Sequence, residues 1–171
     1  MDDISKAIGK SRTSIYYYFK NREEVFQAVL DNLVKEVICE IDANMNKKKS
    51  FEEKIYAFCA TKIKTSEERT SFFRAIESGM NIEEKSKHSE VIAEVHQRLM
   101  EGEKNLLLQV FSVSIASNQI PQVSDKEQET IIFILLSSIR GIRREMALKH
   151  NFDNLKHTMA TLTSMVMKHI G

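Results

Sequence analysis

The sequence predicts an all-α protein with a small helical head at its N-terminus and a larger helical bundle after it. One Pro and five Gly in 171 residues leave little to interrupt a helix. Apolar residues recur at spacings of three and four, which is the period of an amphipathic helix, and no useful stretch alternates as a strand does. A chain of this length suits one or two domains. We assign residues 1–46 to the head with its connecting helix and residues 47–171 to the bundle.

The first predicted element is a short helix that ends in a tight turn. Ile4, Ala7 and Ile8 form its apolar stripe. Gly9 follows, and glycine readily takes the left-handed conformation that closes a helix. Ser11 is a good N-cap for a second helix, because its side chain can accept a hydrogen bond from the next turn. The pattern predicts a helix-turn-helix unit.

The second helix has one apolar face and one polar, aromatic face. Ile15 and Phe19 are four apart, so they share a side that we expect to be buried. The other residues are of types that contact base edges and phosphates; we assign DNA contacts to Ser11, Arg12, Thr13, Ser14, Tyr16, Tyr17, Lys20 and Arg22. From Ile4 to Arg22 there are five Lys or Arg and no acid, whereas the whole chain has a net charge of +1. This local excess favours a phosphate-facing surface over the alternative, a solvated helical hairpin.

The stretch from Ile4 to Phe26 resembles the DNA-binding segment of TetR-family transcriptional repressors. The resemblance rests on the aromatic run that ends in Phe19-Lys20, followed by a helix opened by a polar residue and acids. It implies a TetR-like fold and a homodimer whose head binds a palindromic double-stranded DNA operator. It also implies release from that operator by a small-molecule inducer bound to the C-terminal domain.

Two departures from the family pattern leave an alternative open. Family members usually have a further helix before this motif, and here the chain starts at Met1. Lys10 also stands where an apolar residue is usual, although its aliphatic stem can cover a core. The alternative function is a helical dimerisation or ligand-binding module that has lost DNA binding through N-terminal truncation.

Three capping boxes mark further helix starts, at Asn21–Glu24, Ser50–Glu53 and Ser124–Glu127. The first box opens a helix that we expect to run to about Asn46. Its apolar stripe is Phe26, Val29, Leu33, Val37, Ile41 and Met45. Such a helix is long enough to join the head to the body.

The helices of the body follow in order. After a helix that begins near Phe51, we expect a polar break at residues 66–68 and a short helix closed by Gly79. Residues 81–90 are polar and predict a loop, which is followed by a long helix from Val91. Within that helix, Gly102 marks a bend or a close contact. A loop at residues 118–123 then precedes the last two helices.

No residue pattern in this sequence predicts catalysis or metal binding. The histidines are scattered, and there is no Cys-x-x-Cys, His-Glu-x-x-His, Gly-x-Ser-x-Gly or phosphate-binding Gly loop. We therefore expect neither an enzyme nor a cofactor. Two cysteines, Cys39 and Cys59, suggest reduced thiols in a cytoplasmic protein. No apolar run is long enough to cross a bilayer, and we expect no membrane partner.

A small-molecule site is expected in the body, where a polar minority lies in apolar surroundings. We assign its border to Tyr56, Cys59, Phe73, Phe133, Ser137 and Arg140. Arg140 interrupts an apolar helix and needs a partner, which is either an acid on a neighbouring helix or an anionic ligand. Met and Phe residues at this spacing are equally compatible with plain core.

The last two helices, roughly Asp125–His150 and Asp153–Ile170, are expected to form a homodimer interface. The first of them carries two apolar stripes, more than one core can use. One stripe holds Ile132, Leu135, Ile139 and Ile142, and the other holds Phe133, Leu136 and Arg140. Two helices from each chain would make a four-helix bundle. The alternative is that both helices complete a monomeric bundle.

Overall fold

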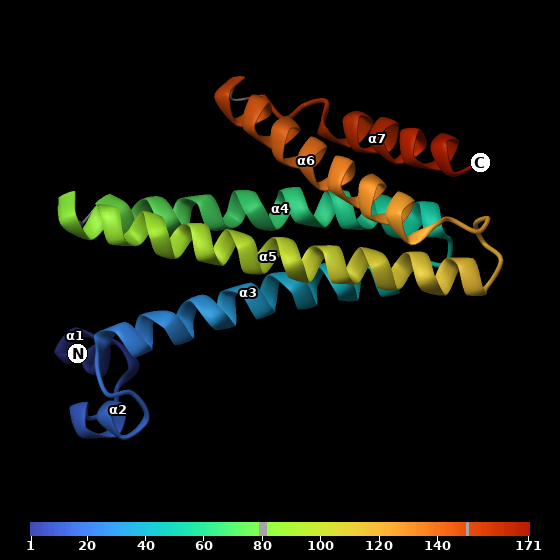
Figure 1. The fold of residues 1–171 in the computed structure, drawn as a ribbon. Helices are drawn as coiled ribbons and strands as arrows, with labels where there is room; N and C mark the ends of the chain where they lie inside the picture. Colours follow the sequence, from blue (N-terminus) through green and yellow to red (C-terminus); the bar gives the residue numbers. More distant parts are fainter. Residues whose placement is uncertain (79–81, 150) are drawn as a thin grey trace. The chain divides into compact units, whose positions relative to one another are not determined.

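The computed structural model describes residues 1–78, 82–149 and 151–171, with side chains described except at residue 3 and residues 70–88. Within these residues it is built of helices, with no strand (Figure 1): α1 (Asp2–Ile8), α2 (Arg12–Tyr18), α3 (Arg22–Asn46), α4 (Phe51–Ser78), α5 (Ile82–Ala116), α6 (Asp125–Lys149) and α7 (Leu155–Ile170). The all-α fold is thus confirmed. The chain divides into two compact units, Met1–Glu36 and Val37–Gly171. The division into domains at residue 46 stays a prediction.

The turn between α1 and α2 is closed by Gly9 in the left-handed conformation. Its φ is 63°, and its amide donates to the Lys6 carbonyl. The amide of Lys10 reaches back to the Ser5 carbonyl at 3.0 Å. These two bonds satisfy carbonyls that the end of a helix leaves without partners. A side chain at position 9 would be strained at this φ, so the predicted use of glycine is confirmed.

Local capping also defines the starts of α3 and α4. The Asn21 side chain accepts from the Glu24 amide at 2.8 Å, while the Glu24 carboxylate accepts from the Lys20 amide at 2.7 Å. At α4, the Ser50 hydroxyl accepts from the Glu53 amide at 3.2 Å, and the Glu53 carboxylate accepts from the Ser50 amide at 3.1 Å. The bond from the Ser50 amide is the main reason that the pKa of Glu53 lies below its usual value.

Two expected breaks in the body are wrong. α4 continues from Phe51 to Ser78 through the polar stretch at residues 66–68, and α5 already begins at Ile82 inside the expected loop at 81–90. Neither stretch contains Gly or Pro. Ser, Glu and Lys all tolerate a helix, so polarity by itself does not end one.

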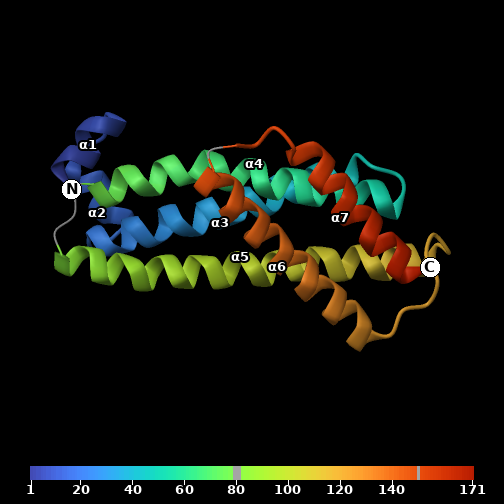
Figure 2. The same cartoon turned by 90° about the horizontal axis from the view of Figure 1, so that it is seen from above.

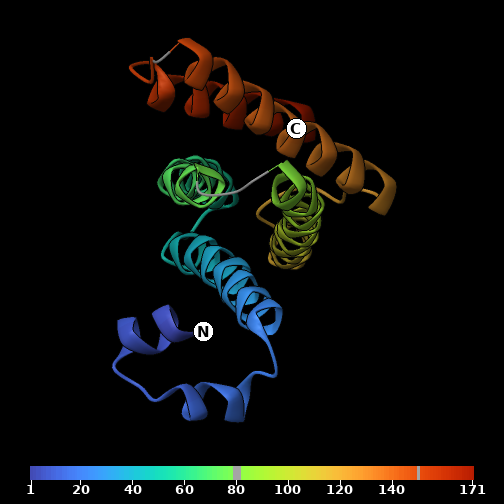
Figure 3. The same ribbon diagram turned by 90° about the vertical axis from the view of Figure 1, so that its left-hand side faces the viewer.

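The second unit is a layered helical bundle. α4 and α5 run antiparallel and side by side, and α6 and α7 lie together on one side of this pair (Figure 3). Seen from above, α6 and α7 cross α4 and α5 obliquely (Figure 2). α4 packs against α5, α6 and α7. None of the helices in the described part of the chain is long and apolar enough to traverse a lipid bilayer.

The core of this unit contains large side chains from several helices. Phe51 of α4 and Phe111 of α5 meet edge to face with ring centroids 4.9 Å apart. Other fully buried side chains include Ile41, Met45, Ile55, Phe58, Ile63, Leu107, Ile132, Leu135 and Ile139. Gly102 marks a close contact, as predicted: a Cβ there would lie 2.8 Å from Cδ1 of Ile38. Glycine at this position lets α5 approach α3.

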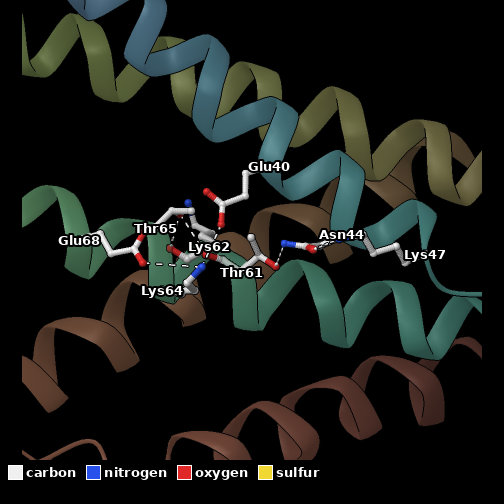
Figure 4. A network of polar contacts seen from close by, with 8 residues as sticks. All are labelled: Glu40, Asn44, Lys47, Thr61, Lys62, Lys64, Thr65 and Glu68. Atoms are coloured by element: carbon white, nitrogen blue, oxygen red, sulfur yellow. Dashed lines mark hydrogen bonds and ion pairs between the residues drawn. The ribbon is translucent and has the colours of Figure 1, made fainter.

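Polar contacts join the C-terminal part of α3 to α4 (Figure 4). The Asn44 amide donates to the Thr61 hydroxyl at 3.3 Å, and Nζ of Lys64 lies 3.2 Å from a carboxylate oxygen of Glu40. The Thr61 and Thr65 side chains are themselves buried. Thr65 satisfies its hydroxyl by donating to the Thr61 carbonyl at 3.0 Å, so burial leaves this group with a partner.

The two apolar stripes expected on α6 are only partly right. The structure buries Ile132, Leu135 and Ile139 of one stripe, but it also buries Leu136 of the other stripe, at 5% exposure. The large apolar residues that α6 leaves exposed are Phe133, Ile134 and Leu148. The Ser124–Glu127 box is also half formed: Ser124 accepts from the Glu127 amide, whereas the Glu127 carboxylate contacts His169 of α7. Packing of α7 on α6 accounts for that difference.

Candidate functional site

The surface of α2 carries the predicted DNA-contacting residues. Ile15 is the buried residue of this helix, whereas the side chains of Arg12, Thr13 and Ser14 are exposed. Tyr17 is 82% exposed. Phe19 is half buried and caps the helix in an extended conformation, so it helps Ile15 as expected but lies outside the helix itself. One apolar side chain therefore holds α2 to its unit while the other sides remain accessible.

Ser11 and Ser14 are tied to each other at the start of α2. The Ser14 amide donates to Oγ of Ser11 at 3.1 Å, and the two hydroxyl oxygens lie 2.8 Å apart. The predicted N-cap is thus confirmed. Because the cap bonds these two hydroxyls to each other and to the helix backbone, α2 itself fixes their positions.

Arg12 is held beside an acid and an aromatic ring in this structure. Its Nη1 lies 3.2 Å from a carboxylate oxygen of Asp2, and its guanidinium carbon lies 5.5 Å from the centre of the Tyr16 ring. Contact with Tyr16 and then the charge of Asp2 raise the pKa of Arg12. Both contacts are solvent-exposed, so they orient the guanidinium without locking it.

The aromatic run and the basic residues after α2 complete this surface. Tyr17 and Tyr18 meet edge to face with ring centroids 5.0 Å apart, and Tyr18 is 74% exposed. Lys20 and Arg22 are exposed as well. Sequence reasoning did not assign Tyr18 a contact, although its place in the aromatic run was a signal.

An open apolar groove lies in the same unit, beside α2. It has a volume of about 910 Å³. Apolar side chains of α1, α2 and α3 supply much of its lining, among them Ile4, Ile8, Ile15, Val25 and Val29. Ile8 is 57% exposed there, so the apolar stripe of the first helix is only partly covered.

The six residues assigned to a ligand site differ in burial, and the assignment stays a prediction. Cys59 is fully buried, and Tyr56 is half buried. Phe133 is 66% exposed on α6 and does not point into the bundle core. Ser137 and Arg140 do meet: Arg140 donates to the Ser137 hydroxyl at 3.1 Å. The side chain of Phe73 lies outside the described residues.

Sequence reasoning missed a charged pair in the interior of the bundle. Lys62 of α4 forms a salt bridge with Glu103 of α5, and the two side chains are 15% and 3% exposed. A signal was present, because Glu103 continues the i, i+4 stripe of Val95, Leu99, Leu107 and Phe111. A charge on an apolar stripe predicts a buried, paired group.

The two cysteines are expected to differ in reactivity. Burial raises the pKa of Cys59 to about 12, whereas Cys39 is exposed. Native protein should therefore react with iodoacetamide at Cys39 and not at Cys59, as read by mass spectrometry. Because the folded pKa of Cys59 lies above its unfolded value, its stabilising contribution is complete below the ordinary thiol pKa and declines as the pH rises towards 12. Equal labelling of both thiols below pH 9 would contradict the buried placement.

Comparison with known proteins agrees with the geometry of the head. Residues 1–29 match the family described as bacterial regulatory proteins, tetR family. No curated protein and no solved structure matches the chain. The matched residues include α1, the Gly9 turn and the whole of α2, where the exposed basic and aromatic surface lies. Residues 1–29 are thus similar to the N-terminal segment of the tetR family of bacterial regulatory proteins, which points to a DNA-binding transcriptional regulator.

Proposed function

We propose that this regulator is a sequence-specific repressor that binds its operator as a homodimer and is released by a small-molecule inducer. The observation that carries the proposal is the surface of α2, where Ile15 is buried and the polar and aromatic side chains face solvent. The basic residues around it add the positive charge that phosphates attract. Dimeric recognition helices would occupy major grooves about one helical turn apart.

The proposed roles follow from side-chain chemistry. Arg12, Thr13 and Ser14 read base edges, since Arg can bond the two acceptors of guanine at once. Tyr16, Tyr17, Lys20 and Arg22 hold phosphates and fix the register of the head. To read a base, Arg12 exchanges its exposed contact with Asp2 for one with DNA.

Two alanine variants test these roles. The protein is first used to select sequences from a random double-stranded DNA library, and binding is then measured as a function of salt. Lys20→Ala should weaken binding to all sequences alike. It should also reduce the slope of log affinity against log salt concentration by about 1. Arg12→Ala should cost about 1–3 kcal/mol on the selected sequence and relax the preference at one base position.

Lys126→Ala is the matched control, because Lys126 is an exposed lysine of α6. It should leave both affinity and salt slope unchanged. If Lys20→Ala and Arg12→Ala acted identically on all operator variants, the division into base and phosphate contacts would be wrong.

The body supplies the proposed dimer contact and the proposed switch. Exposed Phe133, Ile134 and Leu148 on α6 and Met165 on α7 offer an apolar surface to a second copy. An inducer bound in the body would favour one of two positions of α3 and so change the spacing of the two heads.

The open groove favours a second candidate function, a helical dimerisation or ligand-binding module without DNA binding. It leaves apolar side chains such as Ile8 and Val29 exposed, and a head with an uncovered apolar face holds α2 less firmly. The same selection separates the two. If the selection enriches no DNA sequence and the binding signal does not depend on salt concentration, the module without DNA binding is supported.

A further inference from the structure

Arg140 has no acidic partner among the residues that the structure describes. Its guanidinium donates to Sδ of Met100 on α5 and to the hydroxyl of Ser137 on its own helix. Neither group carries charge, and a thioether sulfur is a weak acceptor. The side chain is half buried, so water can solvate it only in part. A guanidinium in this position has unused capacity for an anion.

Glu103 provides the complementary feature on α5. Its side chain is 3% exposed, and one carboxylate oxygen is bonded to Lys62. The other oxygen, Oε2, is buried without a hydrogen-bond partner. Such a group in a low-dielectric interior is costly unless a donor reaches it. A ligand hydroxyl would satisfy it.

Spacing along α5 places these two features together. His96, Met100 and Glu103 lie at i, i+4 and i+7, so they share one face of the helix. Lys62 of α4 meets this face at Glu103, and Arg140 of α6 meets it at Met100. Burial and then the positive charge of Lys62 lower the pKa of His96. The charges of Arg143 and Arg140 lower this pKa further, whereas the negative charge of Glu103 raises it. Cations of α4 and α6 thus contact the same face of α5, at Glu103 and Met100.

The net charge of the contacting groups favours an anion. Lys62 and Arg140 contribute two positive charges and Glu103 one negative charge, which leaves one positive charge. Since Lys62 is neutralised by Glu103, the remaining charge lies on Arg140. The planar guanidinium matches a carboxylate, to which it can donate two parallel hydrogen bonds. Met100 can adjust its shape beside an apolar group.

We propose that this face of α5, between α4 and α6, binds a small hydroxylated carboxylic acid, whose carboxylate pairs with Arg140 and whose hydroxyl donates to Glu103. The proposal deepens the inducer role stated above and rests on it. The carboxylate replaces the Met100 contact of Arg140. The hydroxyl donates a hydrogen bond to Oε2 of Glu103, and the salt bridge between Glu103 and Lys62 stays intact.

Calorimetry on the full chain without DNA tests the binding site directly. The probes are 3-hydroxybenzoate, benzoate, which lacks the hydroxyl, and 3-hydroxybenzamide, which lacks the charge. We expect 3-hydroxybenzoate to bind most tightly and the amide to show no measurable binding. Arg140→Met should weaken 3-hydroxybenzoate by about tenfold or more, because a charge-assisted contact is lost. Binding should also raise the pKa of His96, which NMR titration measures.

Arg144→Met is the matched control, because Arg144 is an exposed arginine of the same helix. It should bind like the unaltered protein. If Arg140→Met does not fold, Arg140→Lys is used, because it keeps the charge but lacks the planar guanidinium that donates two parallel hydrogen bonds. It should also weaken binding. The proposal is overturned if neither carboxylate binds the unaltered protein, or if the Arg140 and Arg144 variants bind alike.

A second assay separates this site from the proposed function. The ligand is added to the complex of the protein with its selected DNA. Binding through Arg140 that leaves the DNA complex intact supports the anion site and overturns its role as the inducer site. Release of DNA by 3-hydroxybenzoate that persists in Arg140→Met supports induction and overturns this site.

Discussion

Lys62→Met is expected to lower the free energy of unfolding of the bundle by about 3–5 kcal/mol. The variant leaves the carboxylate of Glu103 buried without its cation, and the side chain of Glu103 is 3% exposed. Methionine keeps much of the lysine volume, so the loss of stability results from the missing charge and not from a cavity. Urea unfolding followed by circular dichroism measures the change through the midpoint and slope.

Two further variants make this expectation specific. Lys104→Met removes a lysine that pairs with Glu129 at 2.7 Å on the surface, where both side chains are about half exposed. It should cost less than about 1 kcal/mol. The double variant Lys62→Met/Glu103→Leu should recover most of the stability, because an apolar pair of similar volume often replaces a buried ion pair without loss. Equal effects of Lys62→Met and Lys104→Met would contradict the buried placement of Glu103.

Ile134→Glu is expected to convert the proposed homodimer into a folded monomer. Ile134 is 55% exposed on α6, and a Cβ placed at Gly141, seven residues on, would meet open space among the described residues. Leu148, a further seven residues on, is 67% exposed, so this stripe stays exposed in the part of the chain that the structure describes. A stable interface of this kind buries on the order of 2,000 Å² or more. Sedimentation velocity at micromolar concentration measures the state of each protein.

The choice of residue matters for this experiment. Leu135 belongs to one of the two stripes expected at the dimer, but it is 1% exposed, so Leu135→Glu would unfold the bundle and say nothing about the dimer. Val113→Glu is the matched control, since Val113 of α5 is 50% exposed outside α6 and α7. It should remain dimeric. A stable monomer of the unaltered chain would refute the homodimer.

The sequence by itself determined the features that depend on neighbours in the chain. The Gly9 turn, the Ser11 cap and the extent of α3 were all predicted correctly, because each depends on hydrogen bonds between residues at most a few positions apart. The exposed side of α2 belongs to this class, since burial of Ile15 sets which side of the helix faces solvent, whereas the DNA contacts stay a proposal. The order of apolar and polar residues in a short amphipathic helix indicates which of its sides is buried.

Tertiary structure decided what depends on residues distant in the chain. The salt bridge between Lys62 and Glu103 joins positions 41 residues apart, so neither residue signals its partner locally. Glu127 likewise does not complete its own capping box, because its carboxylate contacts His169 of α7. Leu136 was buried and Ile134 exposed because α6 packs against both α4 and α5, which no periodicity along α6 specifies. Periodicity identifies the faces of a helix, whereas the helices packed around it determine which of those faces are buried.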